Sequence, residues 1–263
     1  MKNKAWILLT VVLVSILLSG CAEINEPVTK DSTGIWNEFI VYPLSWSMIK
    51  VAHLIGGPWG FGLSIIVITI LIRMAILPLM IKQMKSLKAT QAIQSELAKL
   101  REKYKSNDAL TQQKLQQEQI LLMQKYDINP MAGCLPILIQ MPILLGFYHA
   151  IMRTEEIKGN SFLWFDLASP DPFFMLPILA GIFTFVQQKV MTKGQEANPQ
   201  MAMMLWVMPI MIIIFSIYLP AALPLYWIIG NIFSIVQSYF INTPEVISGK
   251  TELAAGHMGG KKK

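Results

Sequence analysis

Long apolar stretches alternate with polar connections along most of the chain. Beyond residue 58, five stretches of spanning length contain no acidic residue and at most one basic residue each; they are 59–81, 131–152, 172–190, 201–219 and 221–241. A helix of about 20 apolar residues crosses the hydrocarbon core of a bilayer. The pattern therefore predicts an all-α integral membrane protein with five transmembrane helices, the first at 59–81 and the other four within 131–242.

Prolines interrupt these stretches at Pro78, Pro136, Pro142, Pro177, Pro209 and Pro224. Proline is costly inside a water-exposed helix, but in a membrane neighbouring helices can satisfy the freed backbone groups. We therefore expect kinked helices that pack against one another.

The first 20 residues have the pattern of a secretory signal. A basic start is followed by the apolar run Trp6–Leu18 and by small residues before a cysteine, Leu18-Ser19-Gly20-Cys21. This is typical of a bacterial lipobox, in which the cysteine thiol receives a diacylglyceryl group and the mature chain begins at that cysteine. The sequence thus predicts a lipoprotein signal peptide at 1–20 and a lipidated Cys21 with acyl chains such as palmitate.

An uncleaved first span is the alternative, but the apolar run is shorter than the ~20 residues that a span needs. The other cysteine of the chain, Cys134, lies at the opposite membrane face in the predicted topology. A disulfide requires the two Cα atoms to lie within about 7 Å, so none is expected within one chain.

Two polar segments flank the first predicted span. Within the extracytoplasmic segment 21–58, residues 35–55 mix aromatic and polar side chains and predict an outer interfacial helix, with a simple linker as the alternative because Pro43 interrupts the pattern. Residues 82–130 are dense in good helix formers and predict a cytosolic helical hairpin with arms at 82–104 and 109–126. The break at Ser106-Asn107-Asp108 can turn the chain and cap the second arm. A thin apolar stripe on the first arm suits an antiparallel partner; it comprises Ile93, Leu97, Leu100 and Tyr104.

Lysine and arginine are distributed unevenly between the two sets of connections. The hairpin 82–130, the link 189–200 and the basic tail 243–263 together carry fifteen, whereas the opposite set carries four. By the positive-inside rule, the N-terminus lies outside and the C-terminus lies in the cytosol. This orientation agrees with lipidation of Cys21 on the outer face of a bacterial plasma membrane.

The composition supports lipid as the solvent of this chain. Of its 263 residues, 54% are hydrophobic and 14% are charged, whereas a soluble domain has about 25% charged residues. The net charge of +6 could suggest a nucleic-acid binder, but no recognition motif accompanies it.

Arg73 is the main anomaly, because it lies within the first span and none of the five spans holds an acidic partner for it. Counting back from Lys82 places it about 13 Å inside the bilayer, and a charge there costs about 2.5–3.5 kcal/mol. We expect it to face protein or a watery cavity. The alternative is a side chain that snorkels to the cytosolic headgroups, but the distance of about 13 Å exceeds the comfortable reach of an arginine side chain.

Polar side chains on other spans recur at helical spacing and at a similar depth. Thr69 lies one turn before Arg73. The remaining candidates are Gln140, Thr184, Gln187, Gln188, Trp227, Asn231, Ser234 and Ser238. Individually such residues can act as interhelical hydrogen-bonding groups. Together they predict a hydrophilic groove that is open to the cytosol and closed outside.

Several function classes are not indicated by the sequence. The three histidines have neither metal-ligand nor triad spacing, and neither a hydrolase elbow nor a phosphate-binding glycine loop is present. We therefore expect no enzyme activity, no cofactor and no metal. A proton-coupled transporter would keep an acidic residue within its spans, and none is found.

In combination, several motifs resemble the YidC/OxaA family of membrane protein insertases, in the form that begins as a lipoprotein and lacks a large extracytoplasmic domain. The resemblance covers about residues 58–242. It rests on Gly60-Phe61-Gly62-Leu63-Ser64-Ile65-Ile66 with Thr69 and Arg73, Asn129-Pro130, Gly133-Cys134-Leu135-Pro136, Gln140-Met141-Pro142, Asp171-Pro172, Gln188-Lys189, and Leu225-Tyr226-Trp227 with Asn231. It implies that Arg73 is the groove arginine and that Thr69, Gln188 and Trp227 occupy groove or substrate-contacting positions.

The resemblance further implies a function in helping new membrane proteins to insert and fold, alone or with the Sec translocon, by a protein that works as a monomer. Nascent membrane proteins are then the substrates. The basic hairpin and Lys261–Lys263 could meet ribosomal RNA, substrate or anionic lipids. An ion or solute channel and a non-catalytic Sec accessory subunit are the alternatives from other classes.

Overall fold

The structure is a computed structural model that describes residues 26–106, 108–126, 128, 135–192 and 199–241. The predicted lipidation site Cys21, the second cysteine Cys134 and the lysines at 261–263 lie outside the described residues.

Each of the five predicted apolar stretches forms a helix. These are α3 (Gly60–Ala92), α6 (Leu135–Arg153), α7 (Met175–Met191), α8 (Pro199–Tyr218) and α9 (Ala222–Ile241). Helix α3 continues past residue 81 to Ala92, so the predicted first span and the beginning of the predicted first hairpin arm form one continuous helix. The residues after 81 are mostly good helix formers without glycine or proline, so nothing stops the helix there.

By length and composition, one helix of the described ranges, Gly60–Thr90, is long and apolar enough to cross a membrane. Met175–Met191 and Met203–Tyr218 are apolar but shorter. Three prolines lie in helix interiors, namely Pro78, Pro142 and Pro209. The other three lie in the first turns of α6, α7 and α9, where the backbone N–H has no helical partner to lose.

Residues 35–55 are helical rather than a linker. The π-helical turn η2 (Asn37–Val41) continues directly into α2 (Tyr42–Ile55), and Pro43 lies in the first turn of α2, where proline is tolerated. After a turn at Gly56 and Gly57, which both have positive φ, α3 runs back alongside α2.

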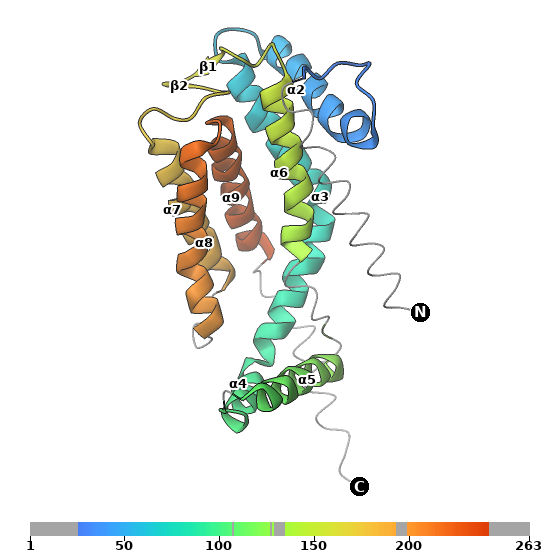
Figure 1. The fold of residues 1–263 in the computed structure, drawn as a ribbon, viewed down its shortest axis with the longest axis vertical. Coiled ribbons are helices and arrows are strands. Elements are labelled where there is room, and N and C mark those ends of the chain that lie inside the picture. The colour runs from blue at the N-terminus through green and yellow to red at the C-terminus, as the bar shows by residue number, and fades with distance from the viewer. Residues whose placement is uncertain (1–25, 107, 127, 129–134, 193–198, 242–263) are drawn as a thin grey trace.

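The helices form one bundle with a shared apolar core. Helix α7 packs against α8 and α9, and α9 also packs against α3 (Figure 1). Close approach is possible because two glycines face bulky groups: a Cβ at Gly62 would lie 2.2 Å from the Phe162 ring, and one at Gly181 would lie 2.4 Å from Ile213. Phe147, Ile151 and Tyr226 contribute buried rings and branched side chains to the core.

A short connection closes the end of the bundle beside α2. It contains the antiparallel strands β1 (Ser161–Phe162) and β2 (Phe165–Asp166), which the sequence did not predict. The buried Asp171 accepts hydrogen bonds from the Trp164 indole N–H at 3.0 Å and from the Leu176 backbone N–H at 2.7 Å. Asp171 therefore joins this connection to the first turn of α7, whose N–H groups favour a carboxylate.

The predicted hairpin is present at the opposite end of the molecule, as α4 (Gln94–Lys103) and α5 (Ala109–Lys125) (Figure 1). Ile93 and Leu97 pack against Ile128, as expected for the thin apolar stripe. Two tyrosine–glutamate hydrogen bonds join the arms: Tyr104 donates to Glu118 at 2.6 Å, and Tyr126 donates to Glu96.

Asp108 caps α5, as the sequence predicted. Its carboxylate accepts the Thr111 backbone N–H at 2.8 Å and the Ser106 hydroxyl at 2.6 Å. Hydrogen bonds from Ser106 and Thr111 lower the pKa of Asp108 from its ordinary 3.8 to about 2. A lowered pKa means that the cap stabilises α5 fully above pH 3.8 and loses this contribution as the pH falls through about 2.

We expect Asp108→Ala to increase hydrogen exchange at the Thr111 amide, because that N–H loses its acceptor. Asp108→Asn is the matched control, since asparagine is an equally good N-cap without the charge. Exchange should rise in Asp108→Ala at neutral pH and stay close to wild type in Asp108→Asn. Equal exchange in all three proteins would contradict the capping role.

Candidate functional site

Arg73 lies in the middle of α3 and is buried, with 7% of its surface exposed. Its Nη2 donates a hydrogen bond to Oε1 of Gln140 on α6 at 3.3 Å, and its Nη1 lies 3.9 Å from the weak acceptor sulfur of Met80. No carboxylate forms an ion pair with it in the part of the chain that the structure describes. The guanidinium is thus held by neutral groups, and its charge is not compensated by them.

Tyr226 on α9 completes this arrangement. The Gln140 amide Nε2 donates to the Tyr226 hydroxyl at 2.5 Å, and Cζ of Arg73 lies 6.0 Å from the centre of the tyrosine ring. We call Arg73, Gln140 and Tyr226 the polar site. Three helices contribute to it, α3, α6 and α9, so its geometry depends on how they pack.

Sequence reasoning missed Tyr226 and selected its neighbour Trp227. Tyr226 is 1% exposed, whereas Trp227 is half-buried and packs against the edge of the apolar core. Adjacent residues on a helix point about 100° apart, so the choice depends on the rotation of α9 about its axis. The available signal was the pair of aromatic residues itself, because a buried tyrosine hydroxyl needs a hydrogen-bond partner.

Gly230 makes room for the guanidinium. A Cβ at this position would lie 2.5 Å from Nη2 of Arg73 and 3.1 Å from its Cζ. Gly230 lies one turn after Tyr226, so both residues face Arg73 from the same side of α9. Sequence reasoning missed this residue as well, because a glycine carries no polar group.

A second hydrogen bond between helices lies on the α7 side of α9. The Asn231 Nδ2 donates to the Thr184 hydroxyl at 2.8 Å, and that hydroxyl donates to the Ala180 carbonyl at 2.7 Å. Two predicted groove residues follow on α7. Gln187 lies 2.7 Å from the sulfur of Met191 on its own helix, and Gln188 is half-buried.

Two other predicted groove residues are bonded within their own helices. The Thr69 hydroxyl is fully buried and donates to the Ile65 carbonyl at 2.6 Å, one turn before Arg73. The Ser234 hydroxyl donates to the Gly230 carbonyl at 2.9 Å. Of the predicted groove residues, the structure therefore brings Arg73 into direct contact with Gln140, and Asn231 into direct contact with Thr184.

Buried polar atoms continue from the polar site toward the hairpin end of the bundle. Within the described residues, several of them have no hydrogen-bond partner: Gln83 Nε2, Gln188 Oε1, Gln237 Oε1 and Ser238 Oγ. Such atoms are costly in an apolar environment, and ordered water is their usual partner. No group of three metal-ligating side chains occurs in the described ranges. The buried guanidinium and these polar atoms give the described part of the bundle an electropositive, polar interior.

The contact between Gly230 and Arg73 predicts non-additive effects on stability. Gly230→Ala should lower the free energy of unfolding by about 1–3 kcal/mol, because the new methyl group overpacks against the guanidinium. In an Arg73→Ala background the same change should instead stabilise the protein, since alanine exceeds glycine in helix propensity by about 1 kcal/mol. The free energies of unfolding of wild type, the two single variants and the double variant give the double-mutant cycle. If the two substitutions have additive effects on the free energy of unfolding, the contact between Gly230 and Arg73 is contradicted.

Comparisons with known proteins show close relatives over the whole chain. The chain is 57% identical to the membrane protein insertase MisCA of Bacillus subtilis over 264 residues, which cover 100% of the chain and 99% of the relative. It is 58% identical to membrane protein insertase YidC 1 of Halalkalibacterium halodurans over 254 residues, 95% of the chain and 96% of that protein. The similarity favours insertion over the channel and Sec-accessory alternatives.

A solved structure and a family model agree with these relatives. The structure of an active YidC insertase with its first transmembrane domain resolved matches with a TM-score of 0.63 and 25% identity, over 79% of this chain and 47% of that longer chain. The model of the 60Kd inner membrane protein family matches residues 51–248. The chain therefore belongs to the 60Kd inner membrane protein family and is a membrane protein insertase of the YidC type.

Proposed function

We propose that this insertase works through a hydrophilic groove centred on Arg73, into which the short polar or acidic flank of an incoming membrane segment enters before it is released outward. The observation that carries the proposal is a buried guanidinium whose described hydrogen-bond partners are neutral. An incoming carboxylate supplies the counter-charge that the five long helices lack, since none of them contains aspartate or glutamate.

Electrostatics favours this interaction at the polar site more than in bulk water. Two opposite charges 4 Å apart interact with about 1 kcal/mol in water, but with about 4 kcal/mol at the lower effective dielectric of a protein surface. The neutral amide of Gln140 holds the guanidinium without cancelling its charge. Arg73 is thus pre-positioned for an anionic group, and no carboxylate of the described residues pairs with it.

Water in the groove would shorten the apolar barrier that the polar flank must cross. The buried polar atoms of Gln83, Gln237 and Ser238 support a hydrated path between Arg73 and the hairpin. Gln83 lies ten residues after Arg73, which corresponds to about 15 Å along α3. With the hairpin in the cytosol, the path opens on the side where substrates are made.

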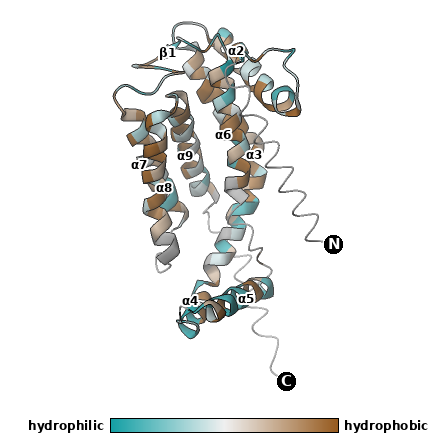
Figure 2. Cartoon of the chain, viewed as in Figure 1, coloured by the Kyte–Doolittle hydropathy of each residue, from teal (hydrophilic) through white to brown (hydrophobic). Residues whose placement is uncertain are grey.

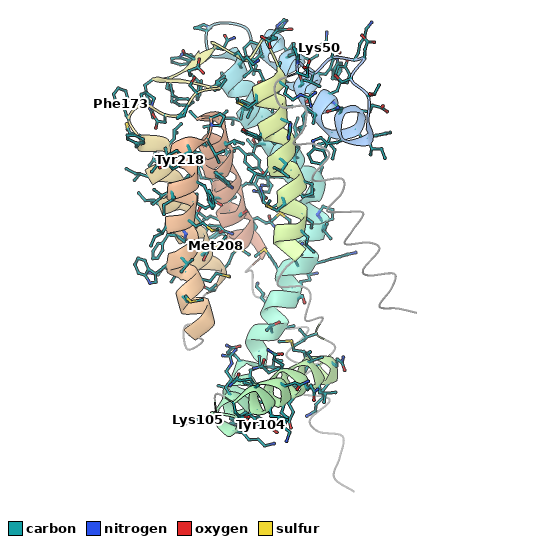
Figure 3. All side chains as sticks on the ribbon, in the orientation of Figure 1. Lys50, Tyr104, Lys105, Phe173, Met208 and Tyr218 are labelled. Atoms are coloured by element: carbon teal, nitrogen blue, oxygen red, sulfur yellow. The ribbon has the colours of Figure 1, made fainter. Side chains whose placement is uncertain are left out.

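The hydrophobic part of a substrate needs an apolar surface beside the groove. Helix α8 offers one, because its exposed side chains are almost all apolar: Met203, Trp206, Val207, Ile210, Ile214 and Tyr218. Figure 2 shows hydrophobic residues concentrated on α7 and α8 and hydrophilic residues on α4 and α5. Met208 and Tyr218 mark α8 in Figure 3. We infer that this surface faces lipid or a docked substrate segment.

The membrane topology follows from the same features. All five long helices span the membrane, η2 and α2 lie at the outer side, and the hairpin and basic tail lie in the cytosol. Lys50 on α2 and Lys105 at the hairpin tip lie at opposite ends of the molecule (Figure 3). Cys21 then lies outside, where lipidation occurs. The Sec translocon, the ribosome and anionic lipids are the proposed partners of the monomer.

Insertion into proteoliposomes that contain this protein alone tests the role of Arg73. We expect Arg73→Ala to slow insertion of a single-span substrate with an acidic N-terminal tail by roughly ten- to a hundredfold, which corresponds to the loss of one charge-assisted hydrogen bond of about 1.5–3 kcal/mol. Arg73→Lys retains the charge and should retain most of the rate.

The same substrate with its acidic residues changed to amides is the control. Its insertion should depend much less on Arg73, because this substrate has no carboxylate for the guanidinium to attract. If wild type, Arg73→Lys and Arg73→Ala insert both substrates equally fast, insertion relies on hydrophobic docking, and the proposed role of the cation is wrong.

The basic tail has a separate test. Deleting residues 250–263 removes the four lysines that lie beyond residue 242 and should weaken co-sedimentation with ribosomes, with a smaller dependence on salt than in the full chain. Insertion of a short substrate without ribosomes should not change. Unaltered co-sedimentation would remove the tail from ribosome binding.

A further inference from the structure

An apolar groove lies between the start of the outer helix and the middle of α3, away from the polar site. Its volume is about 400 Å³. Phe39, Ile40 and Leu44 line it from η2 and α2, and Ile68, Leu71 and Ala75 line it from α3. Phe39 and Leu71 are exposed, with 72% and 52% of their surfaces accessible, so the groove is open along one side.

Helix α6 holds the outer wall of this groove in place. A Cβ at Gly146 of α6 would lie 2.7 Å from Ile40 and 3.0 Å from Leu44, so the absent side chain lets η2 and α2 seat closely against α6. At the end of α6, the buried Arg153 donates from Nη1 to Oδ1 of Asn37 at 2.8 Å. The wall is therefore fixed at two points, and the groove is part of the folded structure.

The same arginine also holds the chain that precedes the groove. Nε of Arg153 donates to the Glu26 carbonyl at 2.7 Å, and its own carbonyl accepts the Val28 backbone N–H at 2.9 Å. Glu26 and Asn37 thus bind one guanidinium, and Asn37 lies two residues before the groove residue Phe39. Cys21 lies five residues before Glu26, and an extended chain of that length reaches about 17 Å.

We propose that an acyl chain carried by Cys21 occupies the apolar groove between η2–α2 and α3. The inference rests on the proposed lipidation of Cys21 and on the proposed topology. Ile68 and Ala75 lie eight and fifteen residues after Gly60, which is about 12–22 Å along α3. An outer-leaflet acyl chain extends through about half of a ~30 Å hydrocarbon core, about 15 Å, so it reaches the Ile68 end of this range.

Covalent attachment to Cys21 favours its acyl chain over an ordinary bilayer lipid as the occupant of the groove. Both offer the same acyl chemistry, and both leave an apolar environment when they enter the groove, so burial alone does not favour either. A covalently attached chain has a high effective concentration at a site within its reach. The clamp at Arg153 shortens that reach to the few residues between Cys21 and Glu26.

Photo-cross-linking of the full chain in its membrane tests the proposal. Cells supplied with a diazirine-bearing palmitate analogue carry the probe on Cys21 and on bilayer lipids; after illumination, mass spectrometry identifies the linked peptides. The expected result is a covalent pair between the Cys21 peptide and a peptide of residues 39–47 or 68–75. Labelling of these residues by free lipid, without a Cys21 pair, would overturn the assignment.

Two substitutions make the test specific. Ala75→Phe fills the groove from α3 and should abolish the cross-link between the Cys21 peptide and the groove peptides. Ser47→Phe fills the groove from α2 and should abolish the same cross-link. Ile70→Phe on the exposed surface of α3 is the matched control and should preserve the pair. A pair that persists in both groove-filling variants would place the acyl chain elsewhere.

The mass of the mature N-terminal peptide separates the two proposals. If that peptide carries no diacylglyceryl group, lipidation itself is wrong and the groove assignment falls with it. If the peptide is lipidated but forms no pair with the groove, lipidation stands and the groove assignment alone is wrong.

Discussion

The burial of one guanidinium among neutral groups is the constraint on which the rest of this structure depends. A charge at this depth costs about 2.5–3.5 kcal/mol, and a carboxylate partner would offset much of that cost while cancelling the field. The protein instead supplies the Gln140 amide and the face of the Tyr226 ring. Neither group cancels the charge, and Gly230 leaves the space in which the guanidinium lies.

This constraint explains why three separate helices must meet at one level. Helix α3 carries the cation, α6 the amide and α9 the tyrosine and glycine, while α7 and α8 pack beyond α9. Polar atoms that lack protein partners among the described residues continue on α3, α7 and α9. The described part of the bundle therefore combines a polar interior on these three helices with a largely apolar exterior on α8.

The second buried arginine is also held by neutral acceptors, but these join separate segments of the chain. Arg153 is held by the Glu26 carbonyl and the Asn37 side chain, so its hydrogen bonds fix the path of the chain at the end of the bundle beside α2. Asp171 does the same for the connection before α7. Specific polar contacts thus fix the chain at the end of the bundle beside α2.

The sequence by itself determined the five helices, the hairpin with its Asp108 cap and the singular position of Arg73, because these follow from apolar length, local hydrogen bonding and the absence of acidic residues. Only the tertiary structure decided that Tyr226 rather than Trp227 contacts Arg73, that Gly230 makes room for it, and that Thr69 bonds its own helix. The physical reason is that contacts between helices depend on the rotation and register with which their surfaces interlock, and residues within one turn do not specify these.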